Sequence, residues 1–212
     1  CPGCHDWDHT VRVWNNARYI AAAESADTWV VHYAAVLHDI GRARDLNDAG
    51  RSCHAECGAA MAADWLNATG LDSDFVDAVV HCVLTHRYRQ RNGRIPETLE
   101  AKVIYDADKL DCIGAVGIGR AFHFAGRVGA RLHNTAEEAE NSASYSRQDT
   151  AYREYLVKLR HVHEAMLTAE GKRMAEERHA FMVTFFERLN AEVEGNDYAL
   201  APDVEDREGP TP

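Results

Sequence analysis

The chain has 212 residues, of which 46% are hydrophobic and 27% charged, and it carries a formal net charge of −11. This length suits one domain with a sizeable core, and the composition excludes extended disorder. The negative charge argues against duplex nucleic acid as a partner, and no apolar run approaches the roughly 20 residues that span a bilayer, so we expect no membrane partner.

The spacing of apolar residues is helical almost throughout. No sustained alternation of apolar and polar residues between hairpin turns is present, so we predict an all-α fold, a single-domain helical bundle. A first helix begins after Asp6 or Asp8, and a second runs from Asp27 to an end at Gly41. The next helices are predicted over residues 52–69, 73–85 and 99–111.

The second half of the chain continues this helical pattern with one long interruption. Residues 87–96 are basic and are predicted to form a loop, and residues 126–146 an irregular surface excursion. Two amphipathic segments, 149–168 and 171–194, then close the fold. The predicted domain covers residues 1–195, and a loose tail covers 196–212.

The six cysteines lie within helical patterns, in a chain large enough not to need disulfides. Cys1 and Cys4 have CxxC spacing, but no second such pair follows, so we expect neither structural zinc nor a redox role there. No signal-peptide pattern opens the sequence. We therefore expect reduced thiols and a cytoplasmic protein.

Four residues offer the ligands that catalytic metals need, imidazole and carboxylate from separate elements. His9 lies in the first turn of the first helix, and Asp108 lies on the helix over 99–111. His38 and Asp39 are adjacent residues, which point about 100° apart on a helix, so both can reach one ion only where the helix ends. One such residue alone is usually structural, but burying the ordered set without a cation would be costly, which favours a metal site.

This ordered set resembles the HD-domain metal-dependent phosphohydrolase superfamily, whose pattern is a His, then a His-Asp doublet, then a distal Asp. Here the pattern reads His9, then LHDIG over residues 37–41, then Asp108 within DADKLD over residues 106–111. The resemblance covers about residues 5–125, and the remainder is similar to the small bacterial branch of the superfamily. It implies a metal held by His9, His38, Asp39 and Asp108.

Some members of the superfamily hold a second ion through two further histidines. His54 and His86 match those positions by their order in the chain, although His81 competes with His86, because residues five apart cannot share a helix face. The alternative is that these histidines lie on the surface. One or two ions are therefore expected. Mn²⁺ is the expected metal and Fe, Co, Ni, Mg and Zn are the other candidates, since mixed imidazole and carboxylate sites discriminate poorly among divalent ions.

Cationic side chains near these ligands are the candidates for binding a phosphorylated substrate. Arg12 follows His9 by three residues, which places it on the same helix face, and is the first candidate; a surface ion pair is the alternative. Lys109 is the second. Arg87 and Arg89 in the basic segment are weaker candidates for outer phosphates.

The reaction also needs proton transfer and oriented ligands. Asp39 is the candidate catalytic carboxylate at the metal. Glu56 or Asp111 is the candidate proton shuttle, or the residue that orients a ligating histidine.

These features predict an enzyme that hydrolyses a phosphate ester or anhydride, with a nucleotide or deoxynucleotide as the expected substrate. A divalent ion lowers the pKa of the water it binds from about 16 towards about 7, which supplies hydroxide for in-line attack on phosphorus. Two alternatives stay open, namely a di-iron oxygenase of the same superfamily and a nucleotide sensor without catalysis. The sequence leaves the oligomeric state open.

Overall fold

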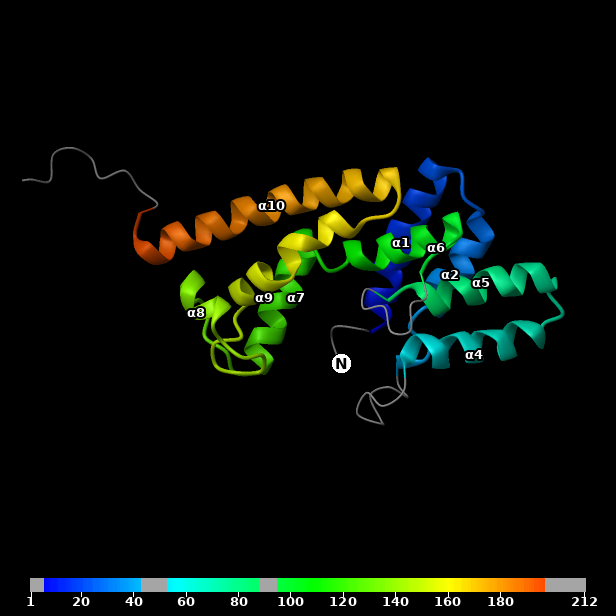
Figure 1. Ribbon diagram of the computed structural model, residues 1–212, viewed down its shortest axis with the longest axis horizontal. Coiled ribbons are helices and arrows are strands. Elements are labelled where there is room, and N and C mark those ends of the chain that lie inside the picture. Colours follow the sequence, from blue (N-terminus) through cyan, green and yellow to red (C-terminus); the bar gives the residue numbers. More distant parts are fainter. Residues whose placement is uncertain (1–5, 43–52, 88–94, 197–212) are drawn as a thin grey trace, which may run out of the picture.

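The computed structural model describes residues 6–42, 53–87 and 95–196, and all regular secondary structure within these ranges is helical (Figure 1). The predicted all-α fold is therefore confirmed. The CxxC pair, Arg89 and most of the predicted tail lie outside the described residues.

The first half of the chain forms helices whose starts follow the predicted capping chemistry. The Asp6 side chain accepts a hydrogen bond from the His9 backbone N–H, and Asp27 does the same for the second helix, as Asp72 does further on. Each carboxylate satisfies a donor that the first helical turn leaves without a partner. The helices are α1 (Trp7–Glu24), α2 (Thr28–Leu37), α4 (His54–Asn67), α5 (Ser73–Thr85) and α6 (Leu99–Leu110).

The second half of the chain packs on one side of these five helices and ends in a long helix. In Figure 1, α10 lies along the side of the molecule that the second half of the chain forms, and its beginning reaches the first half; it packs on α7 and also on α1 and α6. Its elements are α7 (Gly114–Arg127), α8 (Ala136–Glu140), α9 (Ala151–Val157), a 3₁₀ helix η1 (Leu159–Ala165) and α10 (Ala169–Glu194).

The core lies where α1, α2, α5 and α6 meet. Val13 and Ile20 of α1, Val31 of α2 and Ile104 of α6 are fully buried. Many of their neighbours are alanines, and small side chains let helices approach closely, which brings the helix ends within reach of one another.

Three predicted boundaries are wrong in detail. The second helix ends at Leu37 rather than at Gly41. The predicted surface excursion over 126–146 contains α8, whose start is a capping box in which Thr135 and Glu138 bond each other's backbone N–H. The amphipathic segment over 149–168 is two elements, because the backbone breaks at Lys158, with φ −144° and ψ −58°.

A buried carboxylate fixes the start of α10 to α6. Asp106, which is 0% exposed, accepts hydrogen bonds from the backbone N–H of Leu167 and from both the N–H and the hydroxyl of Thr168. Gly171 permits this approach, because a Cβ atom there would lie 2.3 Å from Asp106 Oδ2. The second half of the chain is thereby held next to the end of α6 that carries Asp108.

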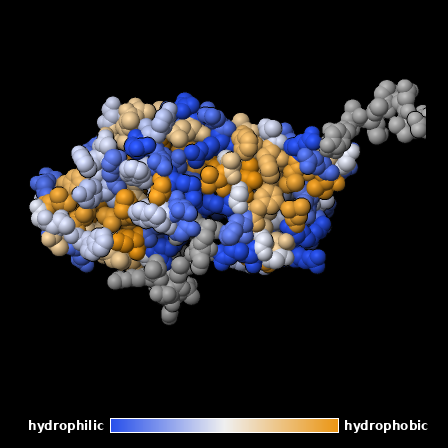
Figure 2. All heavy atoms as spheres, turned by 180° about the vertical axis from the view of Figure 1, so that it is seen from behind, coloured by the Kyte–Doolittle hydropathy of each residue, from blue (hydrophilic) through white to orange (hydrophobic). Residues whose placement is uncertain are grey.

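The surface is mixed. Figure 2, which views the molecule from behind, shows polar atoms over its middle and apolar atoms on both sides of them. Among the described residues, no helix has both the length and the apolar composition needed to cross a bilayer.

Candidate metal centre

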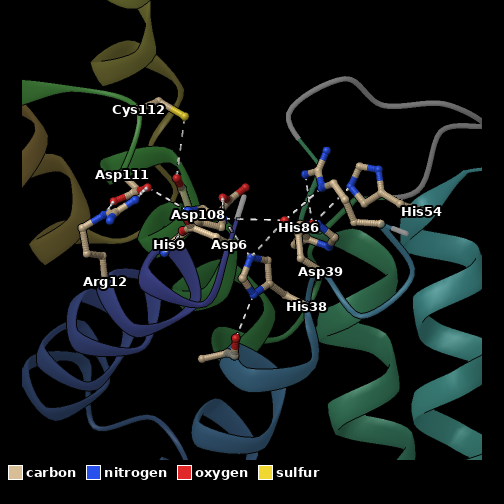
Figure 3. Close-up of polar contacts among 12 residues, drawn as sticks. Asp6, His9, Arg12, His38, Asp39, His54, His86, Asp108, Asp111 and Cys112 are labelled. Atoms are coloured by element: carbon tan, nitrogen blue, oxygen red, sulfur yellow. Dashed lines mark hydrogen bonds and ion pairs between the residues drawn. The ribbon is translucent and has the colours of Figure 1, made fainter. Parts of the chain in front are cut away.

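The ends of α1, α2, α4, α5 and α6 converge on one cluster of histidine and aspartate side chains (Figure 3). Each member lies in the first or last turn of a helix or within two residues after a helix end, where side chains can leave the packed helix faces and meet those of other elements. The six are His9, His38, Asp39, His54, His86 and Asp108.

The cluster is buried although its members are polar. The four histidines are at most 3% exposed and Asp108 is 9% exposed. Burying so many ligand groups costs free energy unless they gain partners of opposite charge or hydrogen-bond partners. A cation is the kind of partner that this set of imidazoles and carboxylates would share.

The first ligand group consists of His9, His38, Asp39 and Asp108. The Nε2 atoms of His9 and His38 lie 3.2 Å apart, and the Nε2 atom of His9 lies 3.5 Å from Asp108 Oδ1. Asp39 Oδ2 lies 3.7 Å from His9 Nε2 and 3.8 Å from His38 Nε2. The structure therefore brings together His9, His38 and Asp39, whose ligand atoms all lie within 4.8 Å of one another, while the fourth predicted ligand, Asp108, joins them through its contact with His9.

The second ligand group consists of Asp39, His54 and His86. The other carboxylate oxygen of Asp39, Oδ1, lies 3.6 Å from His54 Nε2 and 3.7 Å from His86 Nε2. Asp39 is thus shared, with one oxygen facing each group (Figure 3). His81 is excluded from this group, because its Nε2 accepts a hydrogen bond from the backbone N–H of Glu97.

These spacings fit a divalent cation better than they fit hydrogen bonds. Most of them exceed the usual hydrogen-bond range of about 2.7–3.2 Å. Ligand atoms about 2.1 Å from a shared tetrahedral ion lie about 3.4 Å from one another, close to the observed values. The residues present therefore fit a metal ion in both ligand groups.

The hydrogen bonds of the histidines fix which ring nitrogen is available. His38 Nδ1 and His86 Nδ1 each lie 2.7 Å from a backbone carbonyl oxygen, of Ala35 and Val83. A carbonyl can only accept, so each Nδ1 carries the proton and each Nε2 presents its lone pair to the cluster. This outer bond to an acceptor is typical of metal-ligating histidines.

Burial also keeps the ligands in the protonation state that metals bind. It lowers the pKa of His38 to about 4, and burial together with the nearby Arg42 lowers the pKa of His54 to about 4. Burial alone would raise the pKa of Asp108, but the charges of Lys109 and the neighbouring histidines outweigh it and the pKa is lowered. Near pH 7 these imidazoles are neutral and the carboxylate is ionised.

Asp111 holds His9 in place from outside the cluster. Its Oδ2 lies 2.7 Å from His9 Nδ1, and the carboxylate also accepts bonds from Arg12 Nε at 2.6 Å and Arg120 Nη1 at 2.7 Å. Of the predicted candidates for orienting a ligating histidine, Asp111 has the required contact. Arg12 bonds Asp111, which lies outside the two ligand groups, and this position favours a supporting role for Arg12 over the predicted phosphate clamp.

Lys109 is buried between two residues of the cluster. Its Nζ donates to Asp108 Oδ2 at 2.6 Å and to the backbone carbonyl of His86 at 3.2 Å. The ammonium therefore compensates the charge of the Asp108 carboxylate, and a role in binding substrate stays a prediction. Of the other two candidates, Glu56 is exposed in the first turn of α4, and Arg87 donates to Sγ of Cys53, the residue before His54.

Two arginines of the site were not predicted from the sequence. Arg42 Nε and Nη2 contact the two oxygens of Asp39, each at 3.0 Å, so its guanidinium lies where the two ligand groups join. Its three-residue spacing from Asp39 was a readable signal. Arg120 comes from α7, and only the packing of the second half brings it to Asp111.

Comparison with known proteins agrees with this geometry. Residues 6–113 match the HD domain family. The chain is 35% identical to the protein YpgQ of Bacillus subtilis (strain 168) over 195 aligned residues. The aligned region covers 91% of this chain and 86% of YpgQ.

Solved structures share the fold over almost the whole chain. A crystal structure of Bacillus subtilis YpgQ in complex with ADP is 33% identical, with a TM-score of 0.69 and coverage of 92% of each chain. An HD-superfamily hydrolase from Bacillus thuringiensis is 27% identical, with a TM-score of 0.69 and coverage of 90% of this chain and 87% of that one. The chain therefore belongs to the HD-domain superfamily of hydrolases, which confirms the resemblance drawn from its motif.

Proposed function

We propose that this chain hydrolyses a phosphate ester or anhydride of a nucleotide, and that the two ligand groups hold two divalent ions. The observation that carries the proposal is Asp39, whose Oδ2 faces the first ligand group and whose Oδ1 faces the second. A carboxylate with one oxygen in each of two ligand groups is the arrangement that bridges a pair of ions.

Divalent ions held there would supply Lewis-acid activation of the phosphoryl group and hydroxide at neutral pH. The chain supplies orientation and charge. Asp111, held by Arg12 and Arg120, keeps His9 Nε2 pointed at the first group. Lys109 balances the charge of Asp108.

Arg42 is our first candidate for contacting the phosphate that is cleaved. Its guanidinium already lies against both oxygens of Asp39, at the junction of the two ligand groups. The planar fork of a guanidinium matches two phosphate oxygens as it matches two carboxylate oxygens.

The nucleotide assignment draws support from the relative that was crystallised with ADP, which shares 33% of its residues with this chain over 92% of both chains. Mn²⁺ is the activator we expect first, because imidazole and carboxylate ligands together suit it. Other divalent ions would compete for the same groups.

The test uses the full chain stripped of metal and reloaded singly with Mn²⁺, Co²⁺, Ni²⁺, Fe²⁺, Zn²⁺ or Mg²⁺. Nucleoside mono-, di- and triphosphates and cyclic dinucleotides are then screened for release of phosphate or pyrophosphate. We expect turnover with Mn²⁺ and two bound ions per chain by elemental analysis. Asp39→Asn should lose bound metal and at least about 100-fold in kcat/KM, because both groups lose their shared ligand.

Asp77→Asn, which changes an exposed carboxylate on α5, is the matched control and should behave as the wild type. Full activity in Asp39→Asn would refute the proposal. Oxygen uptake with tightly bound iron and no phosphate release would favour an oxygenase instead. Nucleotide binding without turnover under every metal would favour a sensor.

A further inference from the structure

We propose that a cavity beside the end of α6 that carries Asp108 binds the nucleoside part of the substrate; this rests on the proposed nucleotide hydrolysis. The cavity has a volume of about 410 Å³ and lies between α7, α9, η1 and the segment around residues 144–149. This volume falls within the range of about 300–1,000 Å³ typical of small-molecule sites.

The cavity and the metal centre share a wall. Cys112 lines the cavity, and its Sγ lies 3.9 Å from the backbone oxygen of the metal ligand Asp108. Arg120 also lines the cavity, and its Nη1 bonds the Asp111 carboxylate that holds His9. In this proposal, a nucleotide whose phosphates reach the metal ligands extends its sugar and base past Cys112 and Arg120 into the cavity.

The charges around the cavity are already paired. Lys158 Nζ bonds Glu154 at 2.7 Å, and Asp149 accepts from Arg153 at 3.0 Å. Arg120 is paired with Asp111 outside the cavity wall. An anion would have to break these pairs, so the cavity suits an uncharged group better than a phosphate.

Apart from Ser144, the remaining lining is apolar or aromatic. Ala121 and Leu159 contribute aliphatic surface, and Phe124 contributes a ring from α7. Bases stack on aromatic side chains with little dependence on sequence, which gives a planar ring a favourable place beside Phe124.

A second aromatic residue is held at the cavity by a strained backbone. Tyr145 lies at φ +60°, a conformation that a bulky residue rarely adopts, and its backbone N–H donates to Asp149 at 2.6 Å. Tyr145 is 76% exposed, and its ring meets that of Phe124 edge to face, with centroids 5.7 Å apart. Strain of this kind is retained where surrounding bonds enforce it, and it places an exposed aromatic ring where a nucleobase would stack.

The first test measures nucleoside binding in the metal-free full chain, where phosphate chemistry plays no part. Adenosine, guanosine and thymidine are titrated and followed by protein-observed NMR. We expect shifts at residues that line the cavity, and an increase of about tenfold in the dissociation constant for Tyr145→Gly, which keeps the backbone conformation but removes the ring. Tyr145→Phe, which keeps the ring, should bind as the wild type does.

Phe124→Ala should weaken binding in the same direction, and Phe181→Ala, which removes an exposed ring on α10 away from the cavity, is its control. The pocket assignment is overturned if none of the three nucleosides binds at millimolar concentration, or if Tyr145→Gly and Phe124→Ala both bind them as tightly as the wild type does.

The second test separates this inference from the proposed function. With Mn²⁺, kcat/KM is measured for a nucleoside triphosphate and for inorganic tripolyphosphate, which has no base. We expect Tyr145→Gly to lower the ratio of kcat/KM for the nucleoside triphosphate to kcat/KM for tripolyphosphate about tenfold. An unchanged ratio would overturn the assignment of the pocket. A chain that hydrolyses neither compound, but whose nucleoside binding still depends on Tyr145, would overturn the phosphohydrolase proposal and leave the pocket standing.

Discussion

At the scale of single residues, the candidate centre depends on side chains outside the ligand groups that fix the positions of the ligands. Asp111 Oδ2 lies 2.7 Å from His9 Nδ1, and the carboxylate also accepts hydrogen bonds from the guanidinium groups of Arg12 and Arg120. Burial alone would raise the pKa of this carboxyl group, but the bonds to His9 and Arg12 and the charge of Arg120 outweigh it and lower the pKa. It is therefore an ionised anchor for a ligating imidazole, and the position of His9 Nε2 follows from it.

Replacing this anchor tests that role. Asp111→Asn keeps the shape of the side chain but removes the charge, so we expect metal affinity to fall about 10- to 100-fold while the helical content stays unchanged. Metal titration monitored by calorimetry measures the first, and circular dichroism the second. Glu177→Gln, on the exposed face of α10, is the control. Wild-type affinity in Asp111→Asn would show that His9 needs no support from it.

At the scale of elements, the turn after α2 is pressed against the first turns of α4. A Cβ atom on Gly41 would lie 2.3 Å from the backbone oxygen of His54 and 2.5 Å from the backbone nitrogen of Gly58. Backbone atoms cannot yield as a flexible side chain can. The absence of a side chain at Gly41 therefore sets how closely His54 approaches the His38–Asp39 turn.

We expect Gly41→Ala to destabilise the fold by at least about 2 kcal/mol and to weaken metal binding, because the added methyl group must push α4 away from Asp39. Chemical denaturation measures the free energy of unfolding. Gly126→Ala on α7, where a Cβ atom would meet nothing within 4 Å, should leave both quantities nearly unchanged. Equal behaviour of the two variants would contradict the close contact.

At the scale of the whole molecule, folding buries histidines that the unfolded chain leaves in water. His38 has a pKa near 4 when folded, because of burial, against about 6.5 when unfolded. The unfolded chain therefore binds more protons as the pH falls from about 6.5 to about 4, and acid favours unfolding across that window.

For the metal-free protein we therefore expect the free energy of unfolding to decrease from pH 7 to pH 4, by an amount on the order of 3 kcal/mol for His38 alone. Urea denaturation in the presence of a chelator measures it at each pH. His38→Gln should show a weaker dependence on pH over the same window. A free energy of unfolding that does not change over this pH range in the metal-free wild type would mean that burial does not lower the pKa of His38.

Sequence was sufficient where local chemistry decides the outcome. The capping aspartates Asp6 and Asp27 sit where helices begin, because a cap needs only its neighbours in the chain. The capping box at Thr135 also involves only residues close in the chain, so the short helix α8 that follows it was predictable from the sequence. The ordered ligand types and their flanking residues predicted the family and four of the six clustered side chains, and named His54 and His86, the latter in competition with His81, as further candidates.

Tertiary structure alone decided how these side chains meet. The choice of His86 over His81 depends on how α5 is rotated in the bundle, and the sharing of Asp39 between two ligand groups depends on α4 lying against the turn after α2. The contact of Arg120 with Asp111 requires α7 to pack beside the end of α6. Residue type fixes what a side chain can bind, but contacts between distant segments follow from packing, which no short stretch of sequence contains.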